Sequence, residues 1–424
     1  MSVQKLEASL EKLSANIALQ KEVLKKLENS KIRVQRQLNS IRDPVARLPL
    51  EISSEIFVQC LSPRSKSGSP HIPILLSNVC NTWYNIALST PRLWAVIHVD
   101  FPHAESFKQG LETWSRRARN CYLSISLAGA FNSGVGAVLS PYVHRLVYLE
   151  INLVGEGGIG AFLEDMGQGT LPFLKTVRIH DSTVGYGGCS APCILELLRL
   201  APDLAEFMTE VSPVWGDDSE SPEQLVLPAL RRLMFGGRSN LFGRRSNLRG
   251  DDEILKYLSL PNLQSLHLPM QIEDNGLLEF LQRSVPPLQE LMIGDGCRDI
   301  EDFTCFERCV LLVPTLTRLE LSGPSDLLVE EFFSALAESP THMLPNLRSL
   351  IMHLDMDTIT PPDFWTTVLR ALSKRRGQLT YFMIAQYRWT IARPESEVCA
   401  AFRQLAVNGM GIYVGTEEGS IVSA

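Results

Sequence analysis

LPNLQSLHL (residues 260–268) is one copy of a short pattern that recurs along most of this chain. The template is a small or apolar residue, Pro, any residue, Leu, two further residues, Leu, any residue, and Leu. Further copies are LPFLKTVRI (171–179), APDLAEFMT (201–209), LPALRRLMF (227–235), VPPLQELMI (285–293), VPTLTRLEL (313–321) and LPNLRSLIM (344–352), with degenerate copies HRLVYLEI (144–151) and GQLTYFMI (377–384). So many copies exclude an accidental match.

The spacing of the copies indicates a repeat protein. The second Leu-type positions recur 25–33 residues apart, close to the leucine-rich-repeat range of about 20–29 residues. They are Leu149, Val177, Phe207, Leu233, Leu266, Leu291, Leu319, Leu350 and Phe382. Helical patterns between copies cover Ile194–Leu200, Glu253–Leu258, Leu277–Gln282, Glu331–Ala337 and Phe364–Leu372. One strand and one helix per repeat predict an α/β leucine-rich-repeat solenoid with a curved parallel sheet and outer helices.

The leucines of each copy have a structural role, since stacking of neighbouring repeats buries them in one continuous core. The residues between the leucines are expected on the concave face, where a ligand would bind. They include Arg178, Gln264, His267, Glu290, Glu320 and Arg348, and His180 and His353 fall at or just past a strand. These side chains are mixed in sign and indicate no single class of ligand.

Residues 6–41 carry a heptad pattern. Steps of four and three residues give eleven positions, of which nine are apolar: Leu6, Leu10, Leu13, Ile17, Gln20, Leu24, Leu27, Lys31, Val34, Leu38 and Ile41. These positions are called the seam below. The pattern predicts a coiled-coil helix over 1–42, ended by Asp43-Pro44. The seam could bind a second copy of the chain or a partner helix, or fold back on the body of the same chain.

Two amphipathic patterns follow, LPLEISSEIFVQCL (48–61) and ILLSNVCNTWYNIALSTPRLW (74–94). The first predicts a helix with Ile52, Ile56, Phe57, Cys60 and Leu61 on one face. The second predicts a helix whose apolar side holds Leu75, Leu76, Val79, Cys80, Trp83, Ile86 and Ala87, and a strand is expected over 94–99. The polar loop 62–71 separates them. The expected domains are therefore 1–42, a small all-helical unit at 43–98, and the solenoid at 99–424.

Composition narrows the class of protein. The 424 residues carry a net charge of −7, which argues against a general nucleic-acid binder. No stretch approaches the roughly 20 apolar residues that span a bilayer, so no membrane association is expected. The nine cysteines are odd in number and spread over a long chain, so they do not resemble a disulfide framework. This favours a reducing cytoplasmic or nuclear setting. The pairs Cys189/Cys193 and Cys305/Cys309 lack further ligands, so structural cysteines are favoured over zinc.

Two loops carry candidate chemistry. Gly155–Gly160 matches the dinucleotide-binding spacing G-x-G-x-x-G, but its flanking elements belong to the repeat, so a connecting loop is favoured over a cofactor site. The loop 238–249 holds Arg238, Arg244, Arg245 and Arg249. Guanidinium groups bind phosphate and carboxylate, so this loop is a candidate site for a phosphorylated or acidic peptide, with a solvated insertion as the alternative. No constellation indicates catalysis, and no cofactor or metal is expected.

Residues 48–94 resemble an F-box, the motif by which substrate receptors dock onto the adaptor subunit of a cullin-RING (SCF-type) ubiquitin ligase. The resemblance is carried by Leu48-Pro49-x-Glu51-Ile52, Ile56-Phe57, Leu61, Leu75-Leu76-x-x-Val79-Cys80-x-x-Trp83 and Leu93-Trp94. The order of coiled coil, F-box and degenerate leucine-rich repeats is similar to large F-box families of mushroom-forming fungi. The polar loop 62–71 is longer than the motif requires.

The resemblance implies a non-enzymatic substrate-recognition subunit. Its adaptor-facing residues would be Leu48, Pro49, Ile52, Val79, Cys80 and Trp83. The adaptor would connect the chain to the cullin, and the repeats would hold an unidentified substrate protein. Two alternatives stay open: a protein-interaction scaffold outside ubiquitin ligation, and a nucleotide-binding enzyme that uses Gly155–Gly160.

Overall fold

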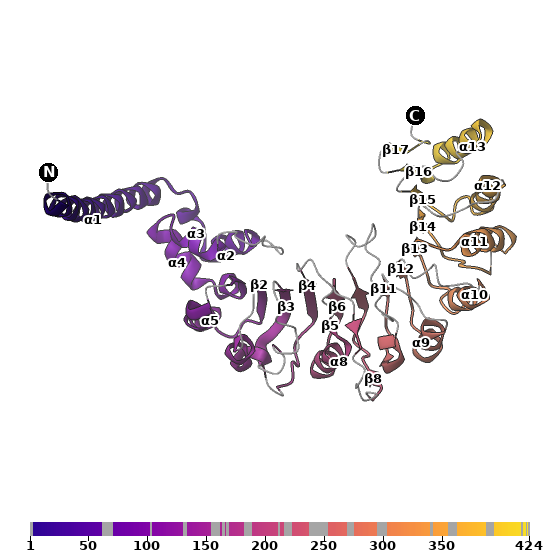
Figure 1. The fold of residues 1–424 in the computed structure, drawn as a ribbon, viewed down its shortest axis with the longest axis horizontal. Helices are drawn as coiled ribbons and strands as arrows, with labels where there is room; N and C mark the ends of the chain where they lie inside the picture. The colour runs from indigo at the N-terminus through magenta and orange to yellow at the C-terminus, as the bar shows by residue number, and fades with distance from the viewer. Residues whose placement is uncertain are drawn as a thin grey trace. The chain divides into compact units, whose positions relative to one another are not determined.

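The computed structural model, shown in Figure 1, describes most of the chain. The chain forms two compact units, Met1–Ser124 and Ile125–Ala424. The described residues are 3–61, 71–101, 104–129, 134–153, 162, 166, 169–181, 189–210, 213–215, 223–236, 253–268, 275–294, 303–339, 342–354, 363–386, 394–416, 419–420 and 422. The fold is mixed α/β, with a long N-terminal helix and a long, mainly parallel sheet.

The first unit is mainly helical. Its elements are α1 (Val3–Arg42), η1 (Val45–Arg47), α2 (Leu50–Gln59), α3 (Ile72–Ser77), α4 (Asn81–Ser89), η2 (Pro91–Trp94), β1 (Val96–Asp100) and α5 (Ala104–Ala118). Helix α1 runs for 40 residues without Gly or Pro and ends directly before Asp43-Pro44, as the restriction that proline places on the preceding residue requires.

Two local predictions in this unit were wrong. The segment 72–89 is not one helix, because it breaks at Asn78–Cys80 into α3 and α4. Cys80 has an extended backbone, and its sulfur accepts a hydrogen bond from the backbone N–H of Trp83, which is the role of an N-cap. The strand begins at Val96 rather than at Trp94, since Trp94 ends the short 3-10 helix η2.

The second unit is organised around the sheet, whose strands follow the order β2-β3-β4-β6-β9-β11-β12-β13-β14-β15-β16-β17. Their bounds are β2 (Leu123–Gly129), β3 (Leu146–Leu153), β4 (Thr176–Asp181), β6 (Glu206–Thr209), β9 (Arg232–Phe235), β11 (Ser265–Leu268), β12 (Glu290–Ile293), β13 (Arg318–Ser322), β14 (Ser349–Leu354), β15 (Tyr381–Gln386), β16 (Gly411–Thr416) and β17 (Gly419–Ser420). From β3 to β16 neighbouring strands are parallel, and β17 is antiparallel to β16.

The parallel strands predicted from the repeats are confirmed, and the structure gives their register. Each second Leu-type position is the direct partner of the next, from Leu149 opposite Val177 to Leu350 opposite Phe382. All nine side chains are at most 1% exposed. Because strand residues alternate between the two faces of a sheet, this register places every core leucine on one side and leaves the intervening residues on the other.

Helices pack against the leucine-bearing face. They are α6 (Val135–Leu139), α8 (Ala191–Leu200), α9 (Gly276–Ser284), α10 (Phe303–Leu311), α11 (Asp326–Glu338), α12 (Phe364–Lys374) and α13 (Ser396–Val407), with 3-10 helices η3 (Ser140–Arg145) and η5 (Glu253–Tyr257). Short strand pairs β5 (Cys189–Ser190) with β7 (Pro213–Val214) and β8 (Leu225–Val226) with β10 (Leu258–Ser259) lie outside the main sheet. Figure 1 shows α9 to α13 in succession along one side of the strands.

Three aromatic contacts join the helices α10, α11, α12 and α13 in succession. The ring centroids of Phe306 on α10 and Phe332 on α11 are 6.0 Å apart, and those of Phe333 on α11 and Phe364 on α12 are 5.9 Å apart. Trp365 on α12 and Phe402 on α13 are 6.2 Å apart. These edge-to-face contacts give the helical layer its own core between neighbouring repeats.

The helices predicted between the repeat strands are confirmed except at Glu253–Leu258, where a 3-10 helix ends at Tyr257 and Leu258 begins β10. The repeat template did not predict β2, β16 or the helices α5 and α13.

Candidate functional site

Several large apolar side chains on the first unit are exposed. Leu48, Leu50, Ile52 and Ile56 lie on α2 or directly before it, and Ile74 and Leu75 lie on α3. Their exposed fractions are 41–52%. This set is called the exposed apolar group below. Burying such side chains against a partner is favourable by roughly 25 cal/mol per Å² of apolar surface, so the group is a candidate protein-binding surface.

A buried framework lies beneath this group. Phe57 on α2 is 1% exposed and packs on Trp83 of α4, with ring centroids 4.9 Å apart. The indole N–H of Trp83 donates a hydrogen bond to Asp43, whose other carboxylate oxygen accepts from the backbone N–H of Val45 at 2.9 Å. The aromatic pair and the carboxylate therefore fix α2 and α4 relative to the end of α1.

Further polar contacts connect the same helices. Thr90 Oγ1 lies 2.7 Å from the carbonyl oxygen of Ile86 and 2.9 Å from Ser54 Oγ on α2. Arg92 forms an ion pair of 3.0 Å with Glu55. The indole N–H of Trp94 donates to the carbonyl oxygen of Ala87 at 2.7 Å. Helix α2 is thus held through Ser54 and Glu55 in addition to Phe57, and its apolar side chains are exposed on a fixed backbone.

The predicted adaptor-facing residues divide into three kinds. Leu48, Pro49 and Ile52 are exposed, while Val79 and Trp83 are half-buried. Cys80 is 1% exposed, so it lies beneath the surface and caps α4 instead of facing outward. The sequence analysis did not include Leu50 and Ile74 in the adaptor-facing set. Both are apolar residues that do not belong to the helix faces expected to be buried, which is the signal that could have identified them.

The second candidate surface is the face of the sheet opposite the leucines, called the open face below. One row of direct strand partners runs across it: Glu150, Arg178, Met208, Met234, His267, Met292, Glu320, Ile351, Met383 and Tyr413. Four of these ten residues are methionines, which are interspersed with polar, charged, aliphatic and aromatic side chains along the row. Methionine is flexible and polarizable and adapts to differently shaped apolar partners.

One end of the open face holds a histidine between two carboxylates. His180 Nε2 lies 3.1 Å from Glu150 Oε1, and His180 Nδ1 lies 3.0 Å from Glu210 Oε1. The hydrogen bonds to Glu150 and then to Glu210 raise the pKa of His180 to about 9. The hydrogen bond from His180 in turn lowers the pKa of Glu150 to about 2. Ser126 Oγ donates to Glu150 Oε2 at 2.8 Å, and the cluster carries a net negative charge at neutral pH.

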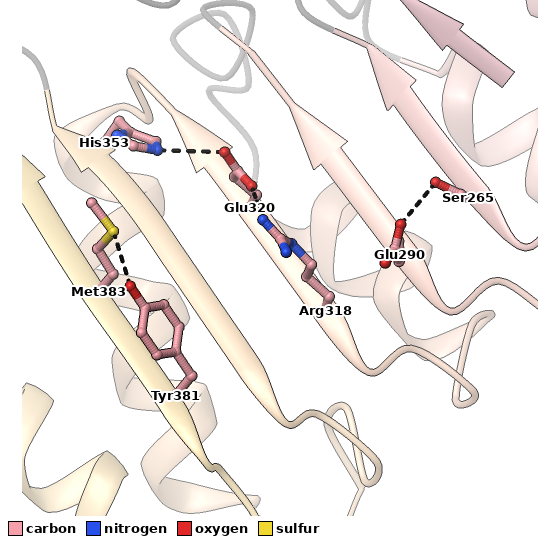
Figure 2. Close-up of polar contacts among 7 residues, drawn as sticks. All are labelled: Ser265, Glu290, Arg318, Glu320, His353, Tyr381 and Met383. Carbon is pink, nitrogen blue, oxygen red and sulfur yellow. Dashed lines mark hydrogen bonds and ion pairs between the residues drawn. The ribbon is translucent and has the colours of Figure 1, made fainter. Parts of the chain in front are cut away.

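A second polar cluster lies further along the open face. Figure 2 shows Glu320 between Arg318 on its own strand and His353 on the next, with helices behind the sheet. Arg318 Nη2 lies 2.9 Å and His353 Nε2 lies 3.4 Å from the two carboxylate oxygens. Burial alone would raise the pKa of Glu320, but the hydrogen bonds from His353 and Arg318 outweigh it and lower the pKa to about 2. Nearby, Ser265 Oγ donates to Glu290 at 3.1 Å.

The predicted concave-face residues mostly lie on the open face. Arg178, His267, Glu290 and Glu320 occupy open-face positions of their strands. Gln264 and Arg348 come directly before β11 and β14 and are exposed. The arginines of the loop 238–249 and the glycines of 155–160 lie outside the described residues.

Among the described residues, no group of three or more His, Cys, Asp or Glu side chains could hold a metal ion. Cys309 on α10 is buried, and burial, together with its neighbour Cys305, raises the pKa of its thiol to about 12. Within the described ranges, no helix combines the length and apolarity needed to cross a membrane.

The chain was compared with known proteins: no protein-family model matches it, and no curated protein matches its sequence.

Proposed function

We propose that this chain is the substrate-recognition subunit of an SCF-type ubiquitin ligase, with an F-box at 43–98 and a leucine-rich-repeat solenoid after it. The observation that carries the proposal is the exposed apolar group on α2 and α3, beside a hydrogen-bonded framework that holds α2 and α4 together. In this reading the exposed apolar group binds the adaptor, and the adaptor connects the chain to the cullin.

The geometry of the group supports a docking role. Leu48 and Ile52 are 41% and 52% exposed although they are large and apolar. Ile52 and Ile56 are four residues apart and share one face of α2. Exposed apolar patches commonly indicate a binding site, and binding energy concentrates in a few well-packed residues. Trp83 contributes from below, since its contact with Phe57 positions α2.

The open face supports the second half of the proposal, in which the repeats hold a substrate protein. Met208, Met234 and Met383 are half-buried on this face and offer adaptable apolar contacts. Charged contacts are offered by Glu150, Arg178, Glu210 and Arg318. Surfaces rich in Met suit partners of varied shape. The chain would transfer nothing itself; it would raise the effective concentration of the target beside a ubiquitin-loaded enzyme.

The docking half is tested by adaptor capture. Full-length protein carrying Ile52→Asp should retain less than a tenth of the wild-type capture of purified adaptor, because a charge cannot be buried in an apolar interface without a large cost. Leu48→Ala with Pro49→Ala should also abolish capture. The matched control is Val407→Asp, which adds the same charge at an exposed apolar residue of α13. Equal circular dichroism of all variants would show that folding is intact.

Capture by Ile52→Asp at the wild-type level would contradict the docking assignment. The link to ubiquitin ligation is tested separately by pulldown from cell lysate, where recovery of the adaptor without the cullin would contradict it and favour a scaffold outside ubiquitin ligation.

The substrate half needs a separate readout. Proximity labelling with Met234→Glu should lose target proteins but keep the adaptor, whereas Ile52→Asp should do the reverse. Labelling patterns that are the same for wild type and Met234→Glu would remove the open face from substrate binding.

A further inference from the structure

Helix α1 presents an apolar stripe that the first unit does not cover. The nine apolar seam residues are 40–77% exposed. The stripe therefore does not pack against the rest of the first unit. At about 1.5 Å per residue the helix is about 60 Å long, and five heptads suffice for a coiled coil.

The contacts that α1 does make come from its other side. Arg36 Nη2 donates to Asn78 Oδ1 at 2.7 Å, and Asn39 Nδ2 donates to the carbonyl oxygen of Val79 at 3.1 Å. Neither Arg36 nor Asn39 belongs to the seam. The rest of the first unit thus holds α1 by its outer face and leaves the seam free for a partner helix.

A parallel pair of two copies fits this helix poorly. It would place Lys31 beside Lys31 and Gln20 beside Gln20 in the core, because equal positions face each other in a parallel pair. Residues 21–42 carry seven Lys or Arg against two Glu, whereas residues 3–20 carry two of each. Parallel packing would bring the two positive halves together. The residues that flank the seam would also form no ion pair of opposite charge.

An antiparallel pair fits in one register. In this register Leu10 faces Ile41 of the second copy, and the layers that follow are Leu13 with Leu38, Ile17 with Val34, Gln20 with Lys31, and Leu24 with Leu27. The two polar seam residues therefore meet each other, so the Lys31 ammonium group can donate to the Gln20 side-chain oxygen. Every other layer is apolar on both sides.

The flanking charges select the same register. Residues directly after alternate seam positions face one another across an antiparallel pair, and they combine as Glu7 with Arg42, Ser14 with Gln35, and Lys21 with Glu28. Shifting the second copy by one heptad puts Lys21 against Lys21 or Glu28 against Glu28, and sets Gln20 and Lys31 against leucines. Buried polar layers and flanking charges are the features that fix register and orientation in coiled coils.

We propose that α1 is an antiparallel homodimerisation helix, in which two copies of this chain pair through the seam with Gln20 of one opposite Lys31 of the other. The proposal uses α1 alone and goes beyond the proposed function. Variants of the seam leave the exposed apolar group intact, so failure of dimerisation and failure of adaptor capture are distinguishable.

A charge swap tests the arrangement in the full chain by sedimentation equilibrium. Wild type should be a dimer, and Lys21→Glu or Glu28→Lys alone should weaken the dimer roughly tenfold at low salt, because each turns two attractive pairs into repulsive ones. The double variant restores both pairs and should return to within about twofold of wild type. In a parallel dimer positions 21 and 28 are about 10 Å apart along the axis, so no rescue would follow.

Chemical cross-linking provides a second measurement that does not depend on dimer strength. With Ser14→Cys and Gln35→Cys in one chain, a short bis-maleimide should join position 14 of one copy to position 35 of the other, as peptide mass spectrometry would show. Positions 14 and 35 of one helix are about 30 Å apart, so a short linker cannot join them within a chain. A 14-to-14 cross-link, a monomer throughout the concentration series, or pairing only with a helix of another protein would overturn the proposal.

Discussion

The indole N–H of Trp83 donates a hydrogen bond to the carboxylate of Asp43, forty residues earlier in the chain. This contact joins α4 to the residue that follows α1. The ring of Trp83 packs on Phe57 at the same time. Trp83, which the motif suggests as part of the docking surface, therefore also connects α4 to α2 and to the end of α1.

Replacing Asp43 by Ala should destabilise the first unit by about 2 kcal/mol, because it leaves the half-buried indole N–H of Trp83 without its acceptor. Val45 would lose its side-chain acceptor as well. Hydrogen exchange measures the effect most directly, since faster exchange is expected in α4 and η1 while β14 in the second unit keeps its wild-type rate.

Two variants separate the hydrogen bond from the packing. Trp83→Phe keeps an aromatic ring against Phe57 and removes the indole N–H donor, so no buried donor is left without an acceptor. It should therefore lower the stability of the first unit less than Asp43→Ala does. Trp83→Ala loses the ring contact and should cost more than Trp83→Phe. Unchanged exchange in Asp43→Ala would show that the carboxylate does not hold α4.

Much of the fold follows from one period in the sequence. The Pro-x-Leu-x-x-Leu-x-Leu copies specify strands, their register and their buried face, because the leucines must be buried and strand residues alternate between faces. The template does not predict β2 and β16, because their sequences lack its Pro and its leucine spacing. Both strands join the sheet by backbone pairing. Tertiary contacts also replaced the expected helix at Glu253–Leu258 by one turn of 3-10 helix and a strand pair.

The candidate surfaces were less predictable than the fold. Helical spacing placed Cys80 on an apolar face of one continuous helix. A cysteine sulfur can also cap a helix, and here it caps the start of α4, directly after the break that separates α3 from α4. The cluster of Glu150, His180 and Glu210 has no sequence signal, since its members lie on or directly after three strands and meet only because the strands stack in register.

Arg375 is the side chain for which the largest loss of stability is expected in the second unit. It follows α12, is 1% exposed, and donates to the carbonyl oxygens of Met343 and Leu344 just before β14. Burial lowers the pKa of its guanidinium to about 10. Arg375→Met would leave both carbonyls without these donors and should cost about 2–4 kcal/mol, seen as faster hydrogen exchange in β14.

The neighbouring Arg376 is exposed, so Arg376→Met is the matched control and should leave exchange in β14 unchanged. Arg375→Lys should recover only part of the loss, because an ammonium group lacks the planar fork that reaches two acceptors. Equal exchange in Arg375→Met and Arg376→Met would refute the structural role of Arg375.

The cysteines should differ sharply in reactivity. Cys309 is buried with a thiol pKa of about 12, and the thiolate is the nucleophilic form, so alkylation by iodoacetamide at pH 8 should leave it unmodified. Cys60 is exposed and should be modified in the folded protein. Peptide mass spectrometry with and without denaturant checks both sites, and labelling of Cys309 at the rate of Cys60 in the folded chain would contradict the burial.

The stability of the second unit should depend on pH through His180. Its pKa in the folded chain is about 9, above the ordinary value of 6.5, so its contribution is fully present below pH 6.5 and disappears as the pH rises through 9. Glu150 has a lowered pKa of about 2, so its contribution is present above pH 4.5 and is lost as the pH falls through 2. Melting temperatures of wild type should therefore fall between pH 6.5 and 9.

His180→Gln should flatten that alkaline decrease, because glutamine does not titrate. His342→Gln is the matched control, since His342 is exposed and its replacement should preserve the wild-type pH profile. Titration of the imidazole by nuclear magnetic resonance gives an independent reading, with a midpoint near 9 expected for His180. A midpoint near 6.5, or an alkaline decrease of the same size in His180→Gln, would show that the two carboxylates do not hold the proton on this histidine.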